Sequence, residues 1–227
     1  FHVLEGVLLP PAVQAALAPT PSDADANIRV AHLSPDVGNV DVYVNGQLAA
    51  EGVAFATVSD WWGVAAGTVD VGVAPAGGDV ILTTSLNVVE GNQVTIAVTG
   101  SAANSTLRTS SFPETVSATA DGAARVVVFN GVQGSPSYDV LVGGVNVGTA
   151  LGYPGTLGDN DGFYTFDTPA GTRDIQFVVS GQTGNVVVDL PGTELEAGQT
   201  YLIAVSGSSA APSAVVVASP VGAAEPA

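Results

Sequence analysis

The chain is predicted to be all-β, with two tandem antiparallel β-sandwiches behind an N-terminal extended strand. Three features of the sequence predict this class. Apolar and polar residues alternate with the period of two that is typical of half-buried strands. Turn-forming residues, among them 28 Gly and 14 Pro, lie mostly between the apolar runs. Sequence landmarks of the first half recur in the same order in the second half, which indicates a duplicated domain.

The duplication is visible as pairs of similar segments. Residues 40–46 match 138–144. The offset between matching landmarks grows from 96 residues at Arg29 and Arg125 to about 106 at Glu90 and Glu196, so the second copy has longer loops. The predicted order is an N-terminal strand and linker, a first domain, a linker, a second domain and a loose tail, at 1–26, 27–117, 118–122, 123–219 and 220–227.

Individual strands follow from local patterns. Val40, Val42 and Val44 alternate with polar or amphipathic residues, and Asn45-Gly46 predicts a tight hairpin after them. About seven short strands are expected in the first domain. Besides 40–44, they include 54–58, 69–73, 80–82, 94–98 and 106–112. In the second domain strands are expected at 125–129, 138–142, 163–166, 175–179, 186–190, 201–205 and 214–218. No helix longer than two turns is expected after residue 17.

The N-terminal segment is predicted to be a separate apolar strand. Residues 1–11 read as one extended strand that ends at Pro10-Pro11, and 18–26 read as a Pro-containing linker spanning about 25–30 Å when extended. Such a strand is stable only when its backbone groups are paired and its side chains are covered. The side chains expected to make this contact are Val3, Leu4, Val7, Leu8 and Leu9.

Three fates are open to this strand. It can dock on a sandwich of its own chain, dock on a neighbouring copy, or fray. Docking on a neighbour is strand addition from head to tail, and it produces an open filament. The filament is the favoured hypothesis, with the chain itself as partner.

Composition excludes several classes of function. The net charge is −17, with four Arg and no Lys, so nucleic acid and anionic lipid are not expected partners. The sequence contains no run of 18 apolar residues, so no membrane-spanning segment is expected. The lack of Cys excludes disulfides and thiolate chemistry. The chain begins at Phe1 without Met or a signal peptide, as expected of a processed product or a fragment. An extracellular or cell-surface location is expected.

The polar residues do not suggest catalysis. His32, Ser34 and Asp36 share one face if extended, but they then lie about 6–7 Å apart, beyond hydrogen-bond reach. Ser34-Pro35-Asp36 is better interpreted as a turn whose side chains bond nearby backbone amides. The chain is therefore predicted not to be an enzyme.

An acidic cluster is a weak calcium candidate. Asp159, Asp161 and Asp167 supply the oxygens that Ca²⁺ prefers, but the EF-hand spacing is absent. A polar hairpin tip is the favoured interpretation, and no other cofactor is expected. Asp41 and Asp139 are expected to bond a neighbouring strand or loop, and pairing with Arg29 and Arg125 is plausible because these arginines also recur.

Adjacent tryptophans suggest a contact surface. In a strand, one of Trp61 and Trp62 would face the core and the other solvent. An exposed indole near Tyr43 could stack on a sugar or lie in a subunit interface.

Two segments resemble known families. The string Arg-Val-Ala-His-Leu-Ser-Pro-Asp at 29–36, followed by 40–46 and 66–68, resembles a family of secreted β-sandwich domains in bacterial and archaeal surface proteins, a domain of unknown function. The resemblance covers about 27–219 and is weaker in the second domain, where Val128 replaces His32. It implies an immunoglobulin-like sandwich outside the cytoplasm and no activity. Residues 2–11 are similar to the closing strand of a fasciclin domain, a cell-adhesion module.

These observations predict an extracellular structural protein. The favoured function is a self-assembling surface filament or matrix subunit joined by N-terminal strand donation. The alternative is a monomeric adhesion or carbohydrate-binding module, with Trp61, Trp62 and Tyr43 as glycan contacts. A hydrolase is disfavoured by the site chemistry.

Overall fold

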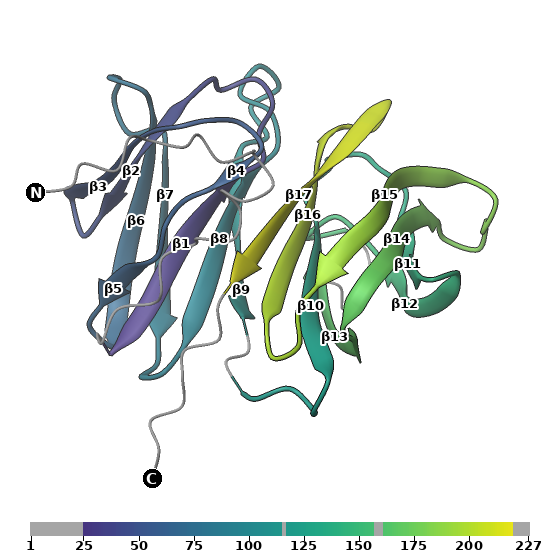
Figure 1. Cartoon of the computed structure of the whole chain (residues 1–227). Coiled ribbons are helices and arrows are strands. Elements are labelled where there is room, and N and C mark those ends of the chain that lie inside the picture. The colour runs from purple at the N-terminus through teal and green to yellow at the C-terminus, as the bar shows by residue number, and fades with distance from the viewer. Residues whose placement is uncertain (1–24, 115–116, 157–160, 220–227) are drawn as a thin grey trace, which may run out of the picture.

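A computed structural model describes residues 25–114, 117–156 and 161–219 (Figure 1). The described residues form seventeen strands and no helix, which confirms the all-β prediction. Strands β1 to β9 form two sheets, and β10 to β17 form two more, in the sandwich arrangement that the duplicated sequence predicts.

The strand bounds follow the duplicated pattern. The first half contains β1 (Ala26–His32), β2 (Val40–Val44), β3 (Gln47–Val53), β4 (Thr57–Val58), β5 (Trp62–Val64), β6 (Gly67–Pro75), β7 (Leu82–Val88), β8 (Gln93–Thr99) and β9 (Arg108–Glu114). The second half contains β10 (Ala123–Asn130), β11 (Tyr138–Val142), β12 (Val145–Leu151), β13 (Phe163–Pro169), β14 (Gly171–Val179), β15 (Val186–Leu195), β16 (Thr200–Ser208) and β17 (Ala211–Ser219).

Each half has one inner and one outer sheet. In the first half, sheet A has the order β4-β1-β8-β9, with β5 also paired to β1, and sheet B has the order β3-β2-β6-β7. In the second half, sheet C has the order β13-β10-β16-β17, and sheet D has the order β12-β11-β14-β15. Sheets A and C therefore correspond to each other, as do sheets B and D.

The inner sheets are mixed rather than purely antiparallel. Strand β1 runs parallel to β8, with Arg29 beside Thr95, and β10 runs parallel to β16, with Arg125 beside Thr200. All other strand pairs of the described residues are antiparallel, so the predicted antiparallel sandwiches are confirmed, with one parallel pair added in each inner sheet. A long connection separates the strands of each pair, which is what parallel pairing requires. The period-two pattern that predicted the strands does not encode their direction.

Local turn chemistry was predicted better than some strand positions. The Asn45-Gly46 hairpin between β2 and β3 is confirmed, with φ of 50° and 77° at its two residues. The strand expected at 54–58 is reduced to the two residues of β4, and the strand expected at 80–82 overlaps β7 only at Leu82. The expected strand list omitted β5 and β12. Gly148 interrupts the alternation in β12, which weakens the sequence signal of that strand.

The four sheets stack in the order B, A, C, D (Figure 1). One apolar cluster fills the space between sheets A and B, and another fills the space between C and D. A third cluster, here called the inter-sandwich core, joins sheets A and C. Its buried members are Ala31, Leu33, Ala97, Phe112, Val127, Phe129, Leu202 and Ala204.

The inter-sandwich core buries sheets A and C on both faces. Every residue of β1 is buried, and seven of the eight residues of β10 are buried. Strands that are covered on both faces carry continuous apolar runs instead of alternation. Residues 126–129 and 201–205 are such runs, so this signal was present in the sequence. The two sandwiches are therefore packed face to face through a shared apolar core.

A buried polar cluster lies at one end of the inter-sandwich core. Arg29 Nη2 lies 2.6 Å from Glu114 Oε1 and donates to Ser219 Oγ at 2.7 Å. Arg29 Nε also donates to Thr95 Oγ1 at 3.0 Å, and Ser219 Oγ donates to Glu114 Oε2 at 2.9 Å. These four residues are here called the Arg29 network. Because Ser219 comes from β17, the network joins the two halves of the chain.

The opposite end of the inter-sandwich core also has polar contacts between the halves. Thr99 Oγ1 and Tyr153 Oη form a hydrogen bond of 3.0 Å. Arg108 Nη1 donates to the carbonyl oxygen of Pro154 at 2.8 Å, and its guanidinium lies 5.7 Å from the centre of the Tyr153 ring. The apolar layer is thus bounded at both ends by hydrogen bonds between the two halves.

Asp41 and Asp139 bond to loops, as expected, but not to arginine. Asp41 accepts hydrogen bonds from the backbone N–H groups of Gly52 and Gly77, each at 2.8 Å. Asp139 accepts from the N–H groups of Ala150 and Gly181 and from a serine hydroxyl. The suggested pairing of these aspartates with Arg29 and Arg125 was wrong, because both arginines point into the layer between sheets A and C, on the far side of each sandwich.

Candidate binding groove

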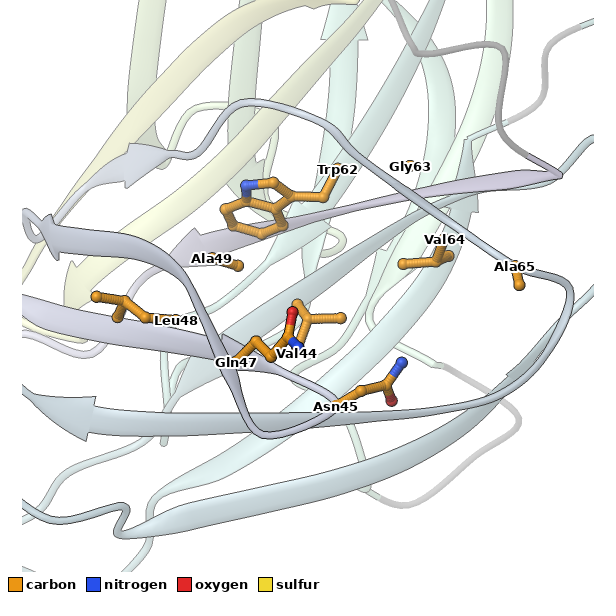
Figure 2. Close-up of a pocket in the computed structure, with 9 residues that line it drawn as sticks. All are labelled: Val44, Asn45, Gln47, Leu48, Ala49, Trp62, Gly63, Val64 and Ala65. Carbon is orange, nitrogen blue, oxygen red and sulfur yellow. The ribbon is translucent and has the colours of Figure 1, made fainter.

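An open groove runs along one edge of the first sandwich, between β3 of sheet B and β4–β5 of sheet A. It consists of two adjoining hollows of about 450 and 430 Å³ that share Ala49 and Trp62. We call it the edge groove, and Figure 2 shows the first hollow. Its lining residues are Val44, Asn45, Gln47, Leu48, Ala49, Ala50, Gly52, Val53, Ala54, Thr57, Val58, Ser59, Asp60, Trp62, Gly63, Val64 and Ala65.

A β-bulge shapes the sheet A side of the groove. Val58 pairs with Ala31 and Trp62 pairs with Ile28, and these registers differ by one residue. The extra residue lies between β4 and β5, where Ser59 replaces regular pairing. The Ser59 N–H donates to the Val30 carbonyl at 2.8 Å, and Ser59 Oγ accepts from the Val30 N–H at 2.9 Å. The edge strand is therefore broken without leaving Val30 unpaired.

The adjacent tryptophans lie on opposite faces of sheet A. Trp62 packs against the core between sheets A and B, and Figure 2 shows its indole pointing into the edge groove beside Ala49. Trp61 faces the other way and lies 4.4 Å from the Arg29 guanidinium carbon. It is only 8% exposed. The expectation that one indole faces solvent was wrong for Trp61, because sheet C covers the outer face of sheet A.

Tyr43 lies on a third surface. It alternates with core residues Val42 and Val44, so its side chain is on the outer face of sheet B, near Gly72 and Val80. It does not line the edge groove. Trp61, Trp62 and Tyr43 therefore do not form one aromatic surface, and only Trp62 belongs to the groove.

The corresponding edge of the second sandwich is filled by larger side chains. Alignment of the strand registers matches Ala49 with Val147 and Thr57 with Tyr164. The Ser59 position is taken by Phe166, which stacks on Tyr164 with ring centres 6.0 Å apart. Val147 and Phe166 pack in the core between sheets C and D. The edge groove is thus a feature of the first repeat that the second repeat fills.

A glycine permits this filling in the second repeat. Gly148 stands at the position of Ala50, and a Cβ atom built there would lie 2.9 Å from the Tyr164 ring. Tyr164 thus covers β12 directly. Comparison of the two repeats in the sequence could have found this difference, but it needs the strand register, which the unequal loops conceal.

The chemistry of the edge groove favours an extended apolar ligand. Ten of its seventeen lining residues are Ala, Val, Leu or Trp, and Asp60 is the charged one among them. In the described residues β3 pairs with β2 alone, and β4 and β5 pair with β1 alone. Their free backbone edges can therefore hydrogen-bond an added strand, while Trp62 offers an apolar contact.

His32, Ser34 and Asp36 are not arranged as a catalytic triad. His32 Nε2 lies 2.7 Å from the Gly38 carbonyl oxygen, and Ser34 Oγ donates to the Gly100 carbonyl at 2.9 Å. Asp36 accepts from Ser101 Oγ at 2.6 Å and from two backbone N–H groups of the same loop. The turn at Pro35-Asp36 is confirmed, and its side chains connect the β1–β2 and β8–β9 loops.

These contacts shift two ionisation equilibria. The hydrogen bonds from Ser101 and the following backbone N–H groups lower the pKa of Asp36 to about 2. Burial lowers the pKa of His32, and its hydrogen bond to the Gly38 carbonyl offsets this only in part. At neutral pH Asp36 is therefore ionised and His32 is uncharged.

The calcium hypothesis stays a prediction. Asp159 lies outside the described residues, and Asp161 is exposed. Asp167 accepts from Arg125 Nε at 2.8 Å and Nη2 at 3.0 Å. Within the described ranges, no three His, Asp or Glu side chains are grouped to hold a metal ion. The segment with Val3, Leu4, Val7, Leu8 and Leu9 also lies outside the described residues.

Comparisons with known proteins add the following. Residues 26–132 match a family described as "Domain of unknown function (DUF4397)". No curated protein matches the chain. Among solved structures, the Bacillus anthracis TIE protein is similar over 80% of this chain and 33% of its own, with 16% identity and a TM-score of 0.26. The chain thus spans about a third of that protein. Among the residues that the structure describes, there is no helix long and apolar enough to cross a membrane.

Proposed function

We propose that this protein is a non-catalytic, extracellular structural subunit that assembles into a filament or matrix by N-terminal strand donation. The observation that carries the proposal is the open edge groove, with its apolar lining and free strand edges. Residues 3–9, Val-Leu-Glu-Gly-Val-Leu-Leu, have the composition of a strand that could enter it. The extracellular location rests on the resemblance of residues 29–36, 40–46 and 66–68 to domains of bacterial and archaeal surface proteins.

The stacking of the four sheets supports a mechanical role. The inter-sandwich core and the Arg29 network connect the two halves through side chains in the interior. A subunit whose repeats are packed in this way transmits force without bending between its domains. Such rigidity suits a filament or matrix subunit better than a flexible tether.

The test compares the full chain with a chain lacking residues 1–17. Electron microscopy of the full chain should show fibres, and sedimentation should show a broad distribution of large species. The deleted chain should remain a folded monomer with the same near-ultraviolet circular dichroism. Monomeric behaviour of the full chain at all concentrations and ionic strengths would contradict the proposal.

A second candidate function is carbohydrate binding at Trp62. The half-buried indole in an open groove has the geometry for stacking on a sugar ring. The broader surface with Trp61 and Tyr43 is not available, because these side chains face elsewhere. Calorimetric titration with oligosaccharides, using Trp62→Ala as control, distinguishes this candidate. Heat of binding that the substitution abolishes would favour it over strand donation.

A further inference from the structure

We propose that the edge groove is the acceptor for residues 3–9 of a second copy of this chain, and that each chain has one acceptor. This inference rests on the proposed function and names its site. With one donor and one acceptor in each chain, the assembly is an unbranched head-to-tail chain of subunits.

The length and pattern of the donor fit the groove. Strand β3, which offers the free edge of sheet B, has seven residues, as has the segment Val3–Leu9. Alternate residues of a strand face opposite sides, so Leu4, Gly6 and Leu8 share one face, and Glu5 is on the other. The uncharged face suits the apolar lining, and its central glycine leaves space for a large side chain.

Trp62 explains why a glycine at the centre of the donor is favourable. The indole stands in the middle of the edge groove, where its two hollows meet. A residue without a Cβ can approach the ring closely, while a leucine on either side enters one hollow each. This arrangement places the bulk of the donor where the groove is empty.

The second repeat does not offer a second acceptor. Val147, Tyr164 and Phe166 occupy the positions whose small counterparts leave the first repeat open. Tyr164 lies over Gly148, so β12 and β13 meet where β3 and β4 stay apart. Because the second sandwich has no open groove at this edge, each chain can accept one donor strand.

A neighbouring copy is the favoured source of the donor. The described chain begins at Asp25, whose carboxylate accepts from the Ala66 N–H at 3.3 Å, beside one end of the groove. The preceding residues 10–24 contain four prolines. Fifteen residues can span about 45 Å when fully extended, against about 23 Å for a seven-residue strand. A segment of that length can therefore reach the groove of another subunit.

The test uses two full-length variants with opposite defects. The sealed-acceptor variant carries Ala49→Val, Ala50→Gly and Thr57→Tyr, which are the residues of the second repeat at the same positions. The glycine is included because the tyrosine ring needs the space that Gly148 provides. The donor variant carries Leu4→Asp and Leu8→Asp and keeps its groove unchanged. Circular dichroism and thermal unfolding check that both variants are folded.

Each variant alone should be monomeric in sedimentation velocity, and an equimolar mixture should form a species of two chains and nothing larger. The intact donor of the first variant then occupies the intact acceptor of the second. Thr149→Arg, at an exposed site of β12 in the filled second repeat, is the matched control and should assemble like the unmodified chain. If the triple variant fails to fold, Ala49→Arg alone places a long side chain in the groove.

Other outcomes overturn distinct parts of the argument. If the sealed-acceptor variant assembles like the unmodified chain, the groove is not the acceptor, although strand donation still stands. If the unmodified chain never assembles, the proposed function itself fails. If the chain is monomeric but Leu4→Asp with Leu8→Asp changes Trp62 fluorescence, the donor docks within its own chain, and assembly through a second copy is refuted.

Discussion

Arg29 and Arg125 occupy the same position in the two repeats but have different surroundings. The Arg29–Glu114 ion pair is 1% exposed at both side chains. The Arg125–Asp167 pair is 10% and 36% exposed, and Arg125 also bonds Ser117. The first pair lies inside the layer between the halves, whereas the second lies at its margin. The equivalent arginines thus form a fully buried ion pair in the first repeat and a partly solvated one in the second.

The edges of the two sandwiches differ in a complementary way. The first repeat has small residues along its open edge and a bulge between β4 and β5. Trp61 there faces Arg29 in the layer next to sheet C, and Trp62 faces the edge groove. The second repeat has a continuous seven-residue edge strand, β13, and fills its edge with aromatic side chains. Duplication therefore supplied two copies of one scaffold, and a few side chains separate an open edge from a closed one.

The largest expected difference between the repeats concerns the ion pairs. Glu114→Ala should lower the free energy of unfolding by about 3–5 kcal/mol, because it leaves the buried Arg29 charge without its carboxylate. Asp167→Ala should cost only about 0–1 kcal/mol, because that pair is partly solvated and Arg125 keeps its bonds to Ser117. Urea unfolding measures both variants. Equal losses would show that depth does not distinguish the pairs.

Packing between the halves is tested at Gly131. A Cβ atom there would lie 2.8 Å from both Leu33 Cδ1 and the Val205 carbonyl oxygen. Gly131→Ala should therefore destabilise the protein by about 1–3 kcal/mol through overpacking. Gly184→Ala is the control, because no atom lies within 4 Å of its Cβ and the change should stabilise by about 0.4–1 kcal/mol. Thermal unfolding gives both values. Absence of a loss at Gly131 would contradict tight packing between the halves.

A difference in pH dependence is expected at His32, which corresponds to Val128. Burial holds the pKa of His32 below its ordinary value of 6.5, so the unfolded chain takes up a proton first as the pH falls. The free energy of unfolding should therefore decline below pH 6.5, by at most about 1.4 kcal/mol per pH unit. His32→Val should remove this part of the decline. Urea unfolding at pH 7.5 and 5.5 measures it, and an unchanged slope in the variant would refute the assignment.

The smallest effect is a reciprocal exchange at one backbone position. Gly52 and Ala150 correspond, have φ of 67° and 56°, and donate to the matching aspartates Asp41 and Asp139. Gly52→Ala should cost about 1 kcal/mol, and Ala150→Gly should gain a similar amount, because alanine is strained at positive φ. Chemical denaturation of both variants tests this. Changes of the same sign would contradict it.

The sequence by itself determined the all-β class, the duplication, most strand positions and the Asn45-Gly46 hairpin. These features depend on alternation and turn residues within a few positions of each other, which a linear pattern records. The same local reasoning correctly interpreted Ser34 to Asp36 as a turn. It failed for β12, where Gly148 and neighbouring small residues weaken the alternation, although that glycine has a clear purpose beneath Tyr164.

Only the tertiary structure decided which surfaces the strands face and which partners they meet. Glu114 is 85 residues from Arg29 and Ser219 is 190 residues from it, so neither contact could be inferred from spacing along the chain. Trp61 is buried because a third apolar layer covers sheet A. The edge groove is open because Ala49 and Thr57 are smaller than Val147 and Tyr164, which stand at the same register positions of the second repeat. Burial of this kind depends on the distance between sheets and on strand register, which are properties of the packed molecule.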